Sequence, residues 1–353
     1  MAIEGLENKF EELSQALAGI KHLYLLCHDN PDPDSLASML ALRYLLSRRF
    51  GIKCVLVYGG EIGRAENQAL VRLLKIPARQ IESVRIGPRA RFAVVDTQPG
   101  SRNHSLPEGA RVVLTFDHHP PNKRLKSAFS HVCEELGATS TMLFEYLQLA
   151  GVEISSRLAT ALAYALISET QDLGREARRN DVLAYQKLIA RASLRTLAEI
   201  KYPVLSHDYF QTLNRALNNT YFYRNIVVTR LGAVNSTDMI HQMADLFLRF
   251  ERRSWSLAIG WNQSHILLSL RSSNVRARCG KMILRLVKGK GTAGGHDMVA
   301  GGRVDCRGMN QKEIRKVEEL IISRFLLALG HSGNLDILAP LVDDEGEGQV
   351  EAG

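Results

Sequence analysis

The amino-acid sequence predicts an α/β protein with an N-terminal domain on a parallel sheet and a smaller C-terminal α/β domain. Short apolar segments alternate with helical patterns through the first half, and the pattern changes near residue 222. Apolar strands separated by helices are typical of a parallel sheet buried on both faces. The length of 353 residues suits two domains of ordinary size.

Four strand-like segments alternate with helical patterns in the first half. The strands are expected at residues 22–27, 53–58, 92–95 and 111–116, and the helices at 35–49, 66–74, 139–149, 156–167, 181–188 and 194–200. Thr139 or Ser140 is suited to cap the helix over 139–149, and Ser155 or Ser156 the next one, because their hydroxyls accept from free backbone N–H groups.

The second half has fewer strand-like segments. Strands are expected at 225–229, 256–259 and 265–270, helices at 237–250, 281–287 and 311–329, and a glycine-rich loop at 289–302. We therefore expect a first domain over residues 1–190, a helical linker over 191–220 and a second domain over 221–340. The segment 341–353 is expected to be a disordered acidic tail.

The charge balance favours anionic ligands. The formal net charge is +8, and the last eleven residues hold five acids and no Lys or Arg, so the remainder carries +13. A positive surplus of this size suits a phosphorylated substrate.

The cysteine pattern and the apolar runs predict a cytoplasmic protein with no membrane partner. The five cysteines are odd in number, scattered, and without a C-x-x-C pair, which fits a reducing compartment. No apolar run approaches the roughly 20 residues that span a bilayer, and the first residues show no signal-peptide pattern.

Potential metal ligands follow directly after the predicted strands. Residues 28–34 (HDNPDPD) follow the first strand, Asp96 ends the third, and residues 117–119 (DHH) end the fourth. A fourth segment, 167–172 (ISETQD), closes a buried helix. Because ligands of an open parallel sheet collect at the carboxyl ends of the strands, the first three segments are expected to meet in one crevice.

The chemistry of these side chains predicts a two-metal site. Asp32 and Asp34 taken alone also fit turn or helix-cap positions, but three equivalent strand ends with the same ligand types favour a shared function. Carboxylate oxygens with some imidazoles suit Mn²⁺, with Mg²⁺ as the alternative. Two cations bridged by a carboxylate relieve the repulsion among the acids and form a clamp for phosphoryl hydrolysis.

These four segments also resemble a known family. HDNPDPDS, VVDTQ, FDHHP and ISETQD resemble the four successive motifs of the DHH superfamily of phosphoesterases, and the resemblance covers roughly residues 20–305. The superfamily includes RecJ-type exonucleases, nanoRNases, cyclic-dinucleotide phosphodiesterases, exopolyphosphatases and a pyrophosphatase family. The resemblance implies a catalytic DHH domain followed by a DHH-associated substrate-binding domain.

The resemblance also implies a role for each motif residue. His28 and Asp32 would hold one metal, Asp34 and His118 the other, and Asp96 would bridge them. His119 would face the phosphate, and Asp117 would orient the histidines. The family's fourth motif normally has Asp before Thr; here Glu169 takes that place and is the favoured ligand, with Asp172 as the alternative.

A second group of residues resembles the substrate clamp of the DHH-associated domain. Gly294, Gly295 and His296 resemble its glycine-glycine-histidine signature, although Ala293 stands where the family usually has a further glycine. Arg271 and Ser272 resemble a strand-end pair that contacts substrate there. Glycine allows close approach of backbone N–H groups to a phosphate, and Arg suits bidentate phosphate binding.

The interpretation that follows is a manganese-dependent phosphodiesterase or phosphatase. The favoured substrates are short oligoribonucleotides, as for a nanoRNase, with 3′,5′-adenosine bisphosphate as a further substrate. Cyclic or linear dinucleotides are the close alternative, and inorganic pyrophosphate is less favoured. A nucleotide-binding regulatory module with a degenerate metal site is a different class of function, which the Glu169 substitution keeps open. The expected partners are short single-stranded RNA or small nucleotides, and a second copy of the chain is a further candidate.

Overall fold

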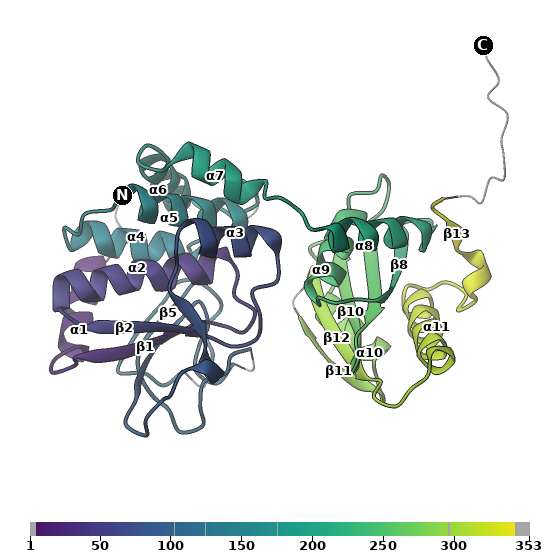
Figure 1. Cartoon of the computed structure of the whole chain (residues 1–353), viewed down its shortest axis with the longest axis horizontal. Helices are drawn as coiled ribbons and strands as arrows, with labels where there is room; N and C mark the ends of the chain where they lie inside the picture. Colours follow the sequence, from purple (N-terminus) through teal and green to yellow (C-terminus); the bar gives the residue numbers. More distant parts are fainter. Residues whose placement is uncertain (1–4, 102, 124, 175, 296, 343–353) are drawn as a thin grey trace, which may run out of the picture. The chain divides into compact units, whose positions relative to one another are not determined.

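The chain forms two compact units, divided between Val204 and Leu205. The computed structural model describes residues 5–342 except 102, 124, 175 and 296 (Figure 1). The division falls inside the segment 191–220 that the sequence indicates as a helical linker. The predicted acidic tail lies outside the described residues from 343 onward.

The first unit is built on a six-stranded sheet in which every neighbouring pair is parallel. The strand order is β3-β2-β1-β4-β5-β6. The strands are β1 (His22–Leu26), β2 (Lys53–Tyr58), β3 (Ala78–Gln80), β4 (Arg91–Val95), β5 (Arg111–Asp117) and β6 (Phe129–Val132). This confirms the predicted fold class of the first domain and its four central strands. The edge strands β3 and β6 were not predicted.

Helices cover one face of this sheet, as Figure 1 shows. They are α1 (Leu6–Ala16), α2 (Pro33–Phe50), α3 (Ala65–Leu73), α4 (Thr139–Leu149), α5 (Ser156–Glu169), α6 (Arg179–Ile189) and α7 (Leu194–Lys201). Ser155 caps α5, as the sequence indicated, by accepting a hydrogen bond from the Leu158 N–H. At α4 the cap residue is Ala138, whose side chain offers no acceptor, so the predicted capping by Thr139 or Ser140 is wrong.

Alternate residues of the strands supply two separate cores. Leu23 and Leu25 of β1 belong to the large core beneath the helices. Tyr24 and Leu26 point to the other face and pack with Ile81 and Phe92, and with apolar side chains from the segments that follow β3 and β4. The sheet is therefore buried on both faces, which explains why its central strands lack the apolar–polar alternation of a half-exposed sheet.

A buried histidine in β6 should make the stability of the first unit depend on pH. His131 is 8% exposed, and its Nδ1 lies 2.8 Å from the Tyr146 hydroxyl oxygen. Burial, with a smaller contribution from the positive charge of Lys9, lowers the pKa of His131 to about 4. The unfolded chain titrates near pH 6.5, so it binds more protons than the folded chain between about pH 4 and 6.5. The stabilisation is complete above this window and is lost as the pH falls through it.

We expect the His131→Gln variant to lose this pH dependence. The glutamine amide can still bond the Tyr146 hydroxyl but takes up no proton. Between pH 7 and pH 4.5 the wild-type free energy of unfolding should fall by about 2–3 kcal/mol more than that of the variant. Urea denaturation at the two pH values measures the difference. Equal pH dependence in both proteins would show that His131 is not held neutral by burial.

The second unit contains a seven-stranded mixed sheet with the order β11-β12-β10-β9-β8-β7-β13. The strands are β7 (Thr220–Tyr223), β8 (Ile226–Ala233), β9 (Trp255–Trp261), β10 (His265–Ser272), β11 (Gly291–Gly295), β12 (Val299–Asp305) and β13 (Ala339–Pro340). Only β8 and β9 pair in parallel; the other neighbours are antiparallel. The predicted smaller α/β domain is confirmed as a fold class.

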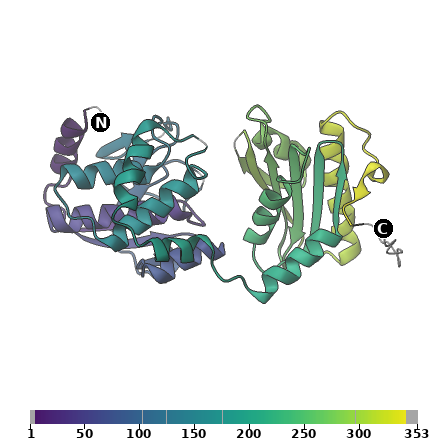
Figure 2. The same ribbon diagram turned by 90° about the horizontal axis from the view of Figure 1, so that it is seen from above.

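Helices pack on both faces of the second sheet (Figure 2). The helices are α8 (His207–Asn218), α9 (Asp238–Phe247), α10 (Cys279–Leu286) and α11 (Gln311–Ala328). Ile226 and Val228 of β8 pack in one core with α10 and α11. Val227, between them in sequence, packs in the other core with residues of α8 and α9.

The predicted glycine-rich loop at 289–302 is wrong over most of its length. Residues 291–295 form β11, and β12 begins at Val299 and pairs with both β11 and β10. Glycine has no side chain to show strand periodicity, so the pattern was typical of a loop. The backbone hydrogen bonds of the neighbouring strands nevertheless hold this segment in the sheet.

The helices of the described residues are too short or too polar to cross a lipid bilayer.

Candidate metal centre

The predicted ligands follow three adjacent strands of the first sheet. His28 comes shortly after β1, Asp96 directly after β4, and Asp117 is the last residue of β5, with His118 and His119 next. β4 lies between β1 and β5 and pairs in parallel with both. The carboxyl ends of the three strands therefore meet at one edge, and the predicted convergence of these segments is observed.

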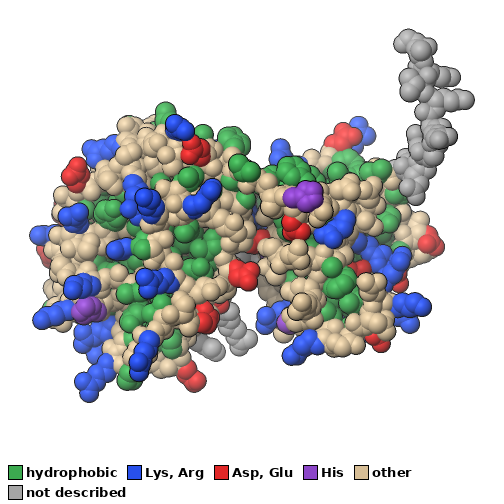
Figure 3. Space-filling model, in the orientation of Figure 1, with side chains coloured by type: hydrophobic (Ala, Val, Ile, Leu, Met, Phe, Trp, Pro, Cys, Tyr) green, Lys and Arg blue, Asp and Glu red, His purple; other side chains and the backbone are tan. Residues whose placement is uncertain are grey.

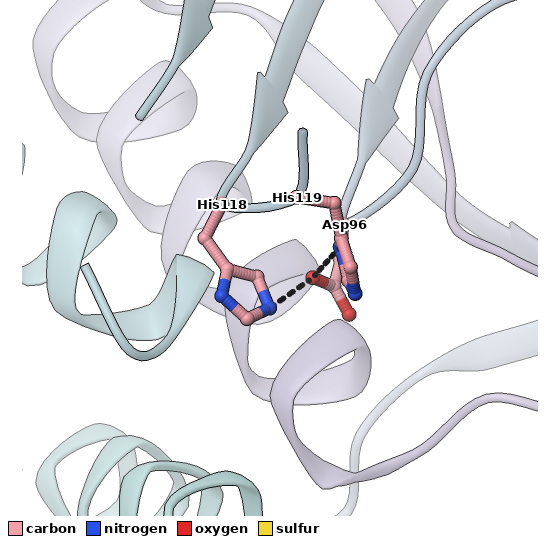
Figure 4. Close-up of side chains that lie close together, drawn as sticks. All are labelled: Asp96, His118 and His119. Atoms are coloured by element: carbon pink, nitrogen blue, oxygen red, sulfur yellow. Dashed lines mark ion pairs between the residues drawn. The ribbon is translucent and has the colours of Figure 1, made fainter. Parts of the chain in front are cut away.

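Asp96 contacts histidines from two different segments, and Figure 4 shows it beside His118 and His119. Its Oδ2 is 3.6 Å from the Nε2 of His28, and its Oδ1 is 3.6 Å from the Nε2 of His118. The side chain is 2% exposed, and its backbone φ of 59° lies in the left-handed region. A buried acid in a left-handed conformation is uncommon and marks functional sites. The two carboxylate oxygens thus face two different histidines.

His28 and Asp32 form one side of the group. The Nε2 of His28 is 3.4 Å from the Oδ2 of Asp32, and its Nδ1 lies 3.0 Å from the Asp29 carbonyl oxygen. The second contact directs Nε2 towards the two carboxylates. The other oxygen of Asp32 accepts a hydrogen bond from the Ser35 N–H and caps α2. Asp32 therefore combines the helix-cap role with a place beside His28 and Asp96.

His118 and His119 form the other side. The ligand atoms of Asp96, His118 and His119 all lie within 4.8 Å of one another, as do those of His28, Asp32 and Asp96. The Nε2 of His118 is buried and makes no hydrogen bond within the described part of the chain. A buried polar atom without a hydrogen bond is costly, so this nitrogen is suited to a ligand bond.

Asp117 positions His119 rather than both histidines. Its Oδ1 lies 2.8 Å from the Nδ1 of His119, and its Oδ2 accepts a hydrogen bond of 2.7 Å from the side-chain amide of Gln98. No direct bond from Asp117 to His118 is seen among the described residues. The ring of His119 is 45% exposed, so it is fixed at one edge and open to solvent.

Asp34 has an additional structural role. Its two oxygens accept hydrogen bonds from the backbone N–H groups of Thr139 (2.7 Å) and Ser140 (2.9 Å). Asp34 therefore caps α4, where Ala138 offers no side-chain acceptor. It is 1% exposed and stays close enough to Asp96, His118 and Glu169 to feel their charges.

Glu169 and Asp172 occupy different environments. Glu169 is half-buried at the end of α5, and its charge acts on both Asp34 and His119. Asp172 bonds to the ammonium group of Lys201 at 2.7 Å, and its side chain is 64% exposed. Glu169 therefore lies near the candidate metal group, whereas Asp172 is paired elsewhere.

Burial and neighbouring charges oppose one another at several members of the group. Burial raises the pKa of Asp34 well above its usual range, and the negative charge of Asp96 raises it further. Burial opposes the charged form of His28, yet Asp32 and Asp96 raise its pKa well above the ordinary value. Burial likewise disfavours ionised Asp117, but the bond and charge of His119 lower its pKa. Several buried carboxylates thus interact with the same few histidines.

The donor set fits a pair of divalent cations. Such ions would offset the repulsion among the buried carboxylates. They would also give a partner to the imidazole nitrogen that makes no hydrogen bond among the described residues. Oxygen donors with a minority of imidazoles match Mn²⁺ and exclude a soft, thiolate-preferring ion.

In the second unit, the predicted clamp residues Arg271 and Ser272 are buried and already paired. The guanidinium of Arg271 forms an ion pair with Asp245 of α9 and is 6% exposed. The Ser272 hydroxyl donates to the Ser254 carbonyl oxygen at 2.8 Å. In this structure, both side chains therefore serve the packing of the second unit.

Gly294 and Gly295 lie on the exposed edge strand β11, and His296 lies outside the described residues. Gly295 borders a cavity of about 350 Å³ that is lined by Arg278, Gly280, Lys281, Gly295 and Asp297. Gly280 is required here, because a Cβ atom would come within 2.3 Å of the Gly295 carbonyl oxygen. Arg278 and Lys281 were not predicted as site residues, since isolated charges on a surface carry no signal in the sequence.

Two residues that support the metal group were also missed. The Thr139 hydroxyl donates to the Oδ1 of Asp96 at 2.8 Å, and Gln98 bonds Asp117 as described above. Gln98 lies in the VVDTQ motif, so its place beside Asp96 was a usable signal. Thr139 comes from a helix 43 residues further along the chain, and only the tertiary structure brings it to Asp96.

A protein-family comparison decides the assignment of the first unit. Residues 22–166 match the model of the DHH family, N-terminal domain. The first unit is a DHH-family domain. The match covers the first three motifs and ends just before the fourth, at residues 167–172.

Proteins similar in sequence to this chain include both uncharacterised and named proteins. An uncharacterised protein of Methanocaldococcus jannaschii is 32% identical over 315 residues, which cover 87% of this chain and 64% of the relative. A probable manganese-dependent inorganic pyrophosphatase of Exiguobacterium is 29% identical over 144 residues, covering 40% of this chain and 46% of the relative. The chain therefore spans less than two thirds of either relative's length.

One solved structure shows the same fold over most of the chain. An exopolyphosphatase-related protein of Bacteroides fragilis matches with a TM-score of 0.70, covering 89% of this chain and 96% of the other. The sequence identity is 14%, so the likeness concerns the fold alone. It supports an α/β domain followed by a second, C-terminal domain.

Proposed function

We propose that this DHH protein is a phosphoester hydrolase that works with two divalent cations, Mn²⁺ foremost, and cuts short oligoribonucleotides. 3′,5′-Adenosine bisphosphate is a further proposed substrate. The observation that carries the proposal is Asp96, a buried carboxylate whose two oxygens face His28 on one side and His118 on the other. The DHH-family match and the relatives named as manganese-dependent pyrophosphatases support it.

Each ligand has a proposed place. His28 and Asp32 would hold one cation, His118 and Asp34 the other, with Asp96 between them and Glu169 completing the second position. Two bound cations would polarise a phosphoryl group and acidify a water molecule. Asp34 can serve in this way while it caps α4, because each carboxylate oxygen accepts more than one bond.

His119 is proposed to contact the phosphoryl oxygens. Asp117 bonds one edge of its ring and is itself bonded by Gln98. The ring is therefore already ordered, and little side-chain entropy is lost when the open edge binds a phosphate. The oxygens of a phosphoryl group gain charge in the transition state, and a positioned donor stabilises that charge. Asp117 is thus a positioning residue in this proposal.

We assign the anchoring of the nucleotide to the cavity beside Gly295 in the second unit. Arg278 and Lys281 line it, together with Gly280, Gly295 and Asp297. Both basic side chains suit a phosphate that is distant from the one being cut. Arg271, which the sequence suggested for this role, is paired with Asp245 instead.

Inorganic pyrophosphate is the strongest rival substrate. The pyrophosphatase relatives of Exiguobacterium and Methanocaldococcus jannaschii cover 40% and 42% of this chain, at 29% and 24% identity. A regulatory module that binds nucleotide without hydrolysis is the rival of another class. Its support is Glu169 in place of the usual acid of the fourth motif.

A substrate panel with Mn²⁺ tests the proposal. It contains RNA of two to five residues, linear and cyclic dinucleotides, adenosine bisphosphate and pyrophosphate. We expect the short RNA series to be turned over fastest, with mononucleotides as products. We also expect Lys281→Ala to raise KM for RNA several-fold and to change kcat little, since Lys281 would bind a phosphate that does not react.

The outcomes separate the rivals. Turnover of pyrophosphate alone would replace the proposed substrate class, and tight nucleotide binding with no turnover of any compound would favour the regulatory module. Lys316→Ala, an exposed lysine on α11, is the matched control for Lys281→Ala. Equal effects of the two variants on KM would remove the anchoring role from the cavity.

A further inference from the structure

Two adjoining cavities lie along the second half of α2. The first has a volume of about 370 Å³ and is lined by Leu40, Arg43, Tyr44, Ser47, Arg48 and Arg157. The second has a volume of about 320 Å³ and is lined by Arg43, Ser47, Gly51, Ile52, Lys53 and Cys54. Arg43 and Ser47 border both, so we treat the two as one feature, the α2 groove.

The α2 groove is separate from the candidate metal centre. Asp34 lies in the first turn of α2, whereas Arg43 and Ser47 follow it by nine and thirteen residues. At 1.5 Å per residue, these positions are roughly 14 and 20 Å further along the helix axis. Lys53 opens β2, at the amino end of the strands and opposite the metal ligands. A ligand in the groove would therefore not touch the metal group.

Every charged side chain that lines the groove is basic. Arg43 and Arg48 come from α2, Lys53 from β2 and Arg157 from α5. Within residues 5–342, excluding the four gaps, none of the four forms an ion pair with a carboxylate. Basic side chains also predominate over acidic ones on the face of the first unit seen in Figure 3.

Structural roles account for only part of this cluster. Arg48 lies in the last turn of α2 and interacts favourably with its carbonyl end. Arg157 donates one hydrogen bond to the Lys75 carbonyl oxygen at 2.7 Å. Neither explanation covers Arg43, which is half-buried, or Lys53. Like charges from three elements repel one another across a small volume, and a bound anion would offset that repulsion.

The remaining lining suits a nucleotide rather than a bare anion. Tyr44 is half-buried and offers an aromatic surface, Leu40 is buried beneath it, and Ser47 offers a hydroxyl. Bases stack on aromatic rings, and arginines bind phosphates through paired N–H groups. The volume lies at the lower end of the range of small-molecule sites, about 300–1,000 Å³.

We propose that the α2 groove is a second nucleotide site, which binds a nucleoside polyphosphate without a metal ion. The phosphates contact the guanidinium groups of Arg43, Arg48 and Arg157, and the base contacts Tyr44. This site goes beyond the proposed hydrolase function and does not depend on it.

Calorimetric titration of the full chain with ATP in EDTA and 150 mM salt tests the site. ATP is the nucleotide probe, and inorganic triphosphate and adenosine are the separate arms. We expect saturable ATP binding that weakens at least tenfold in Arg43→Gln and is abolished in Ser47→Glu, which places a carboxylate at the wall shared by both cavities. Arg49→Gln, an exposed residue of the same helix that does not line the groove, should bind ATP as the wild type does.

The titrations with triphosphate and adenosine separate binding of a nucleotide from a general attraction of anions to basic side chains. Tyr44→Leu should weaken ATP binding and leave triphosphate binding unchanged. If the second unit also binds ATP, Ser47→Glu should reduce the number of sites by one. Absence of saturable ATP binding in the wild type, or equal weakening by Arg49→Gln and Arg43→Gln, would overturn the proposal. Thermal melting of each variant checks its fold, and Ser47 is exposed, so Ser47→Glu is expected to fold.

Discussion

The Asp96→Asn variant is expected to lose at least about a hundredfold of the proposed Mn²⁺-dependent hydrolysis of short RNA, more than a change next to a ligand usually costs. Asn removes the negative charge that both histidines face and replaces one oxygen by an amide nitrogen. Its backbone tolerates the left-handed conformation of this position. The Thr139 hydroxyl can still donate to the remaining oxygen. Loss of activity without loss of fold is therefore the expected result, measured by kcat/KM and thermal melting.

Asp172→Asn is the matched control for this prediction. It removes the same charge from an acid that is exposed and paired with Lys201. We expect its rate to stay within about twofold of the wild type, because such exposed pairs contribute little. Wild-type activity in Asp96→Asn would contradict the central role of Asp96. A large loss in Asp172→Asn, with none in Glu169→Gln, would move the fourth-motif ligand from Glu169 to Asp172.

Addition of Mn²⁺ to protein prepared in EDTA and then dialysed is expected to stabilise the first unit by several kcal/mol. A ligand that binds only the folded state contributes about 2.7 kcal/mol at a hundred times its Kd. For a unit of this size, that corresponds to a rise in Tm of about 5–10 °C. The physical reason is the electrostatic repulsion among the buried acids. It is reflected in the pKa of Asp34, which burial raises and the negative charge of Asp96 raises further.

Differential scanning calorimetry with and without Mn²⁺ measures this effect. His118→Ala should lose most of the shift, because it removes the buried nitrogen that makes no hydrogen bond among the described residues. His265→Ala, a histidine loss in the second unit, should keep the full shift. A shift of equal size in His118→Ala and the wild type would show that the ion binds elsewhere.

Some local features were readable from the sequence because their cause is local. The four central strands are continuous apolar runs, and both faces of their sheet are buried, so composition alone marks them. Ser155 caps α5 through a hydrogen bond to a residue three positions away. The edge strands β3 and β6 are short and less buried, and their pairing partners, not their composition, define them.

The glycine segment shows where local reasoning ends. Residues 291–295 have no side-chain pattern of a strand, and they become one because β12 offers its backbone groups along their length. Arg271 illustrates the same limit for function. Its type and position suggested phosphate binding, but Asp245, 26 residues away on α9, pairs with it.

The sequence by itself determined the α/β class, the central strands and the kinds of ligand that stand at their ends. Strand ends and ligand types are properties of short segments, so they can be predicted without knowledge of the fold. The tertiary structure alone decided that Asp96 lies between two histidines, that Asp34 caps α4, and that basic residues from α2, β2 and α5 share one groove. These depend on contacts between segments tens of residues apart, and the order of the strands in the sheet sets them.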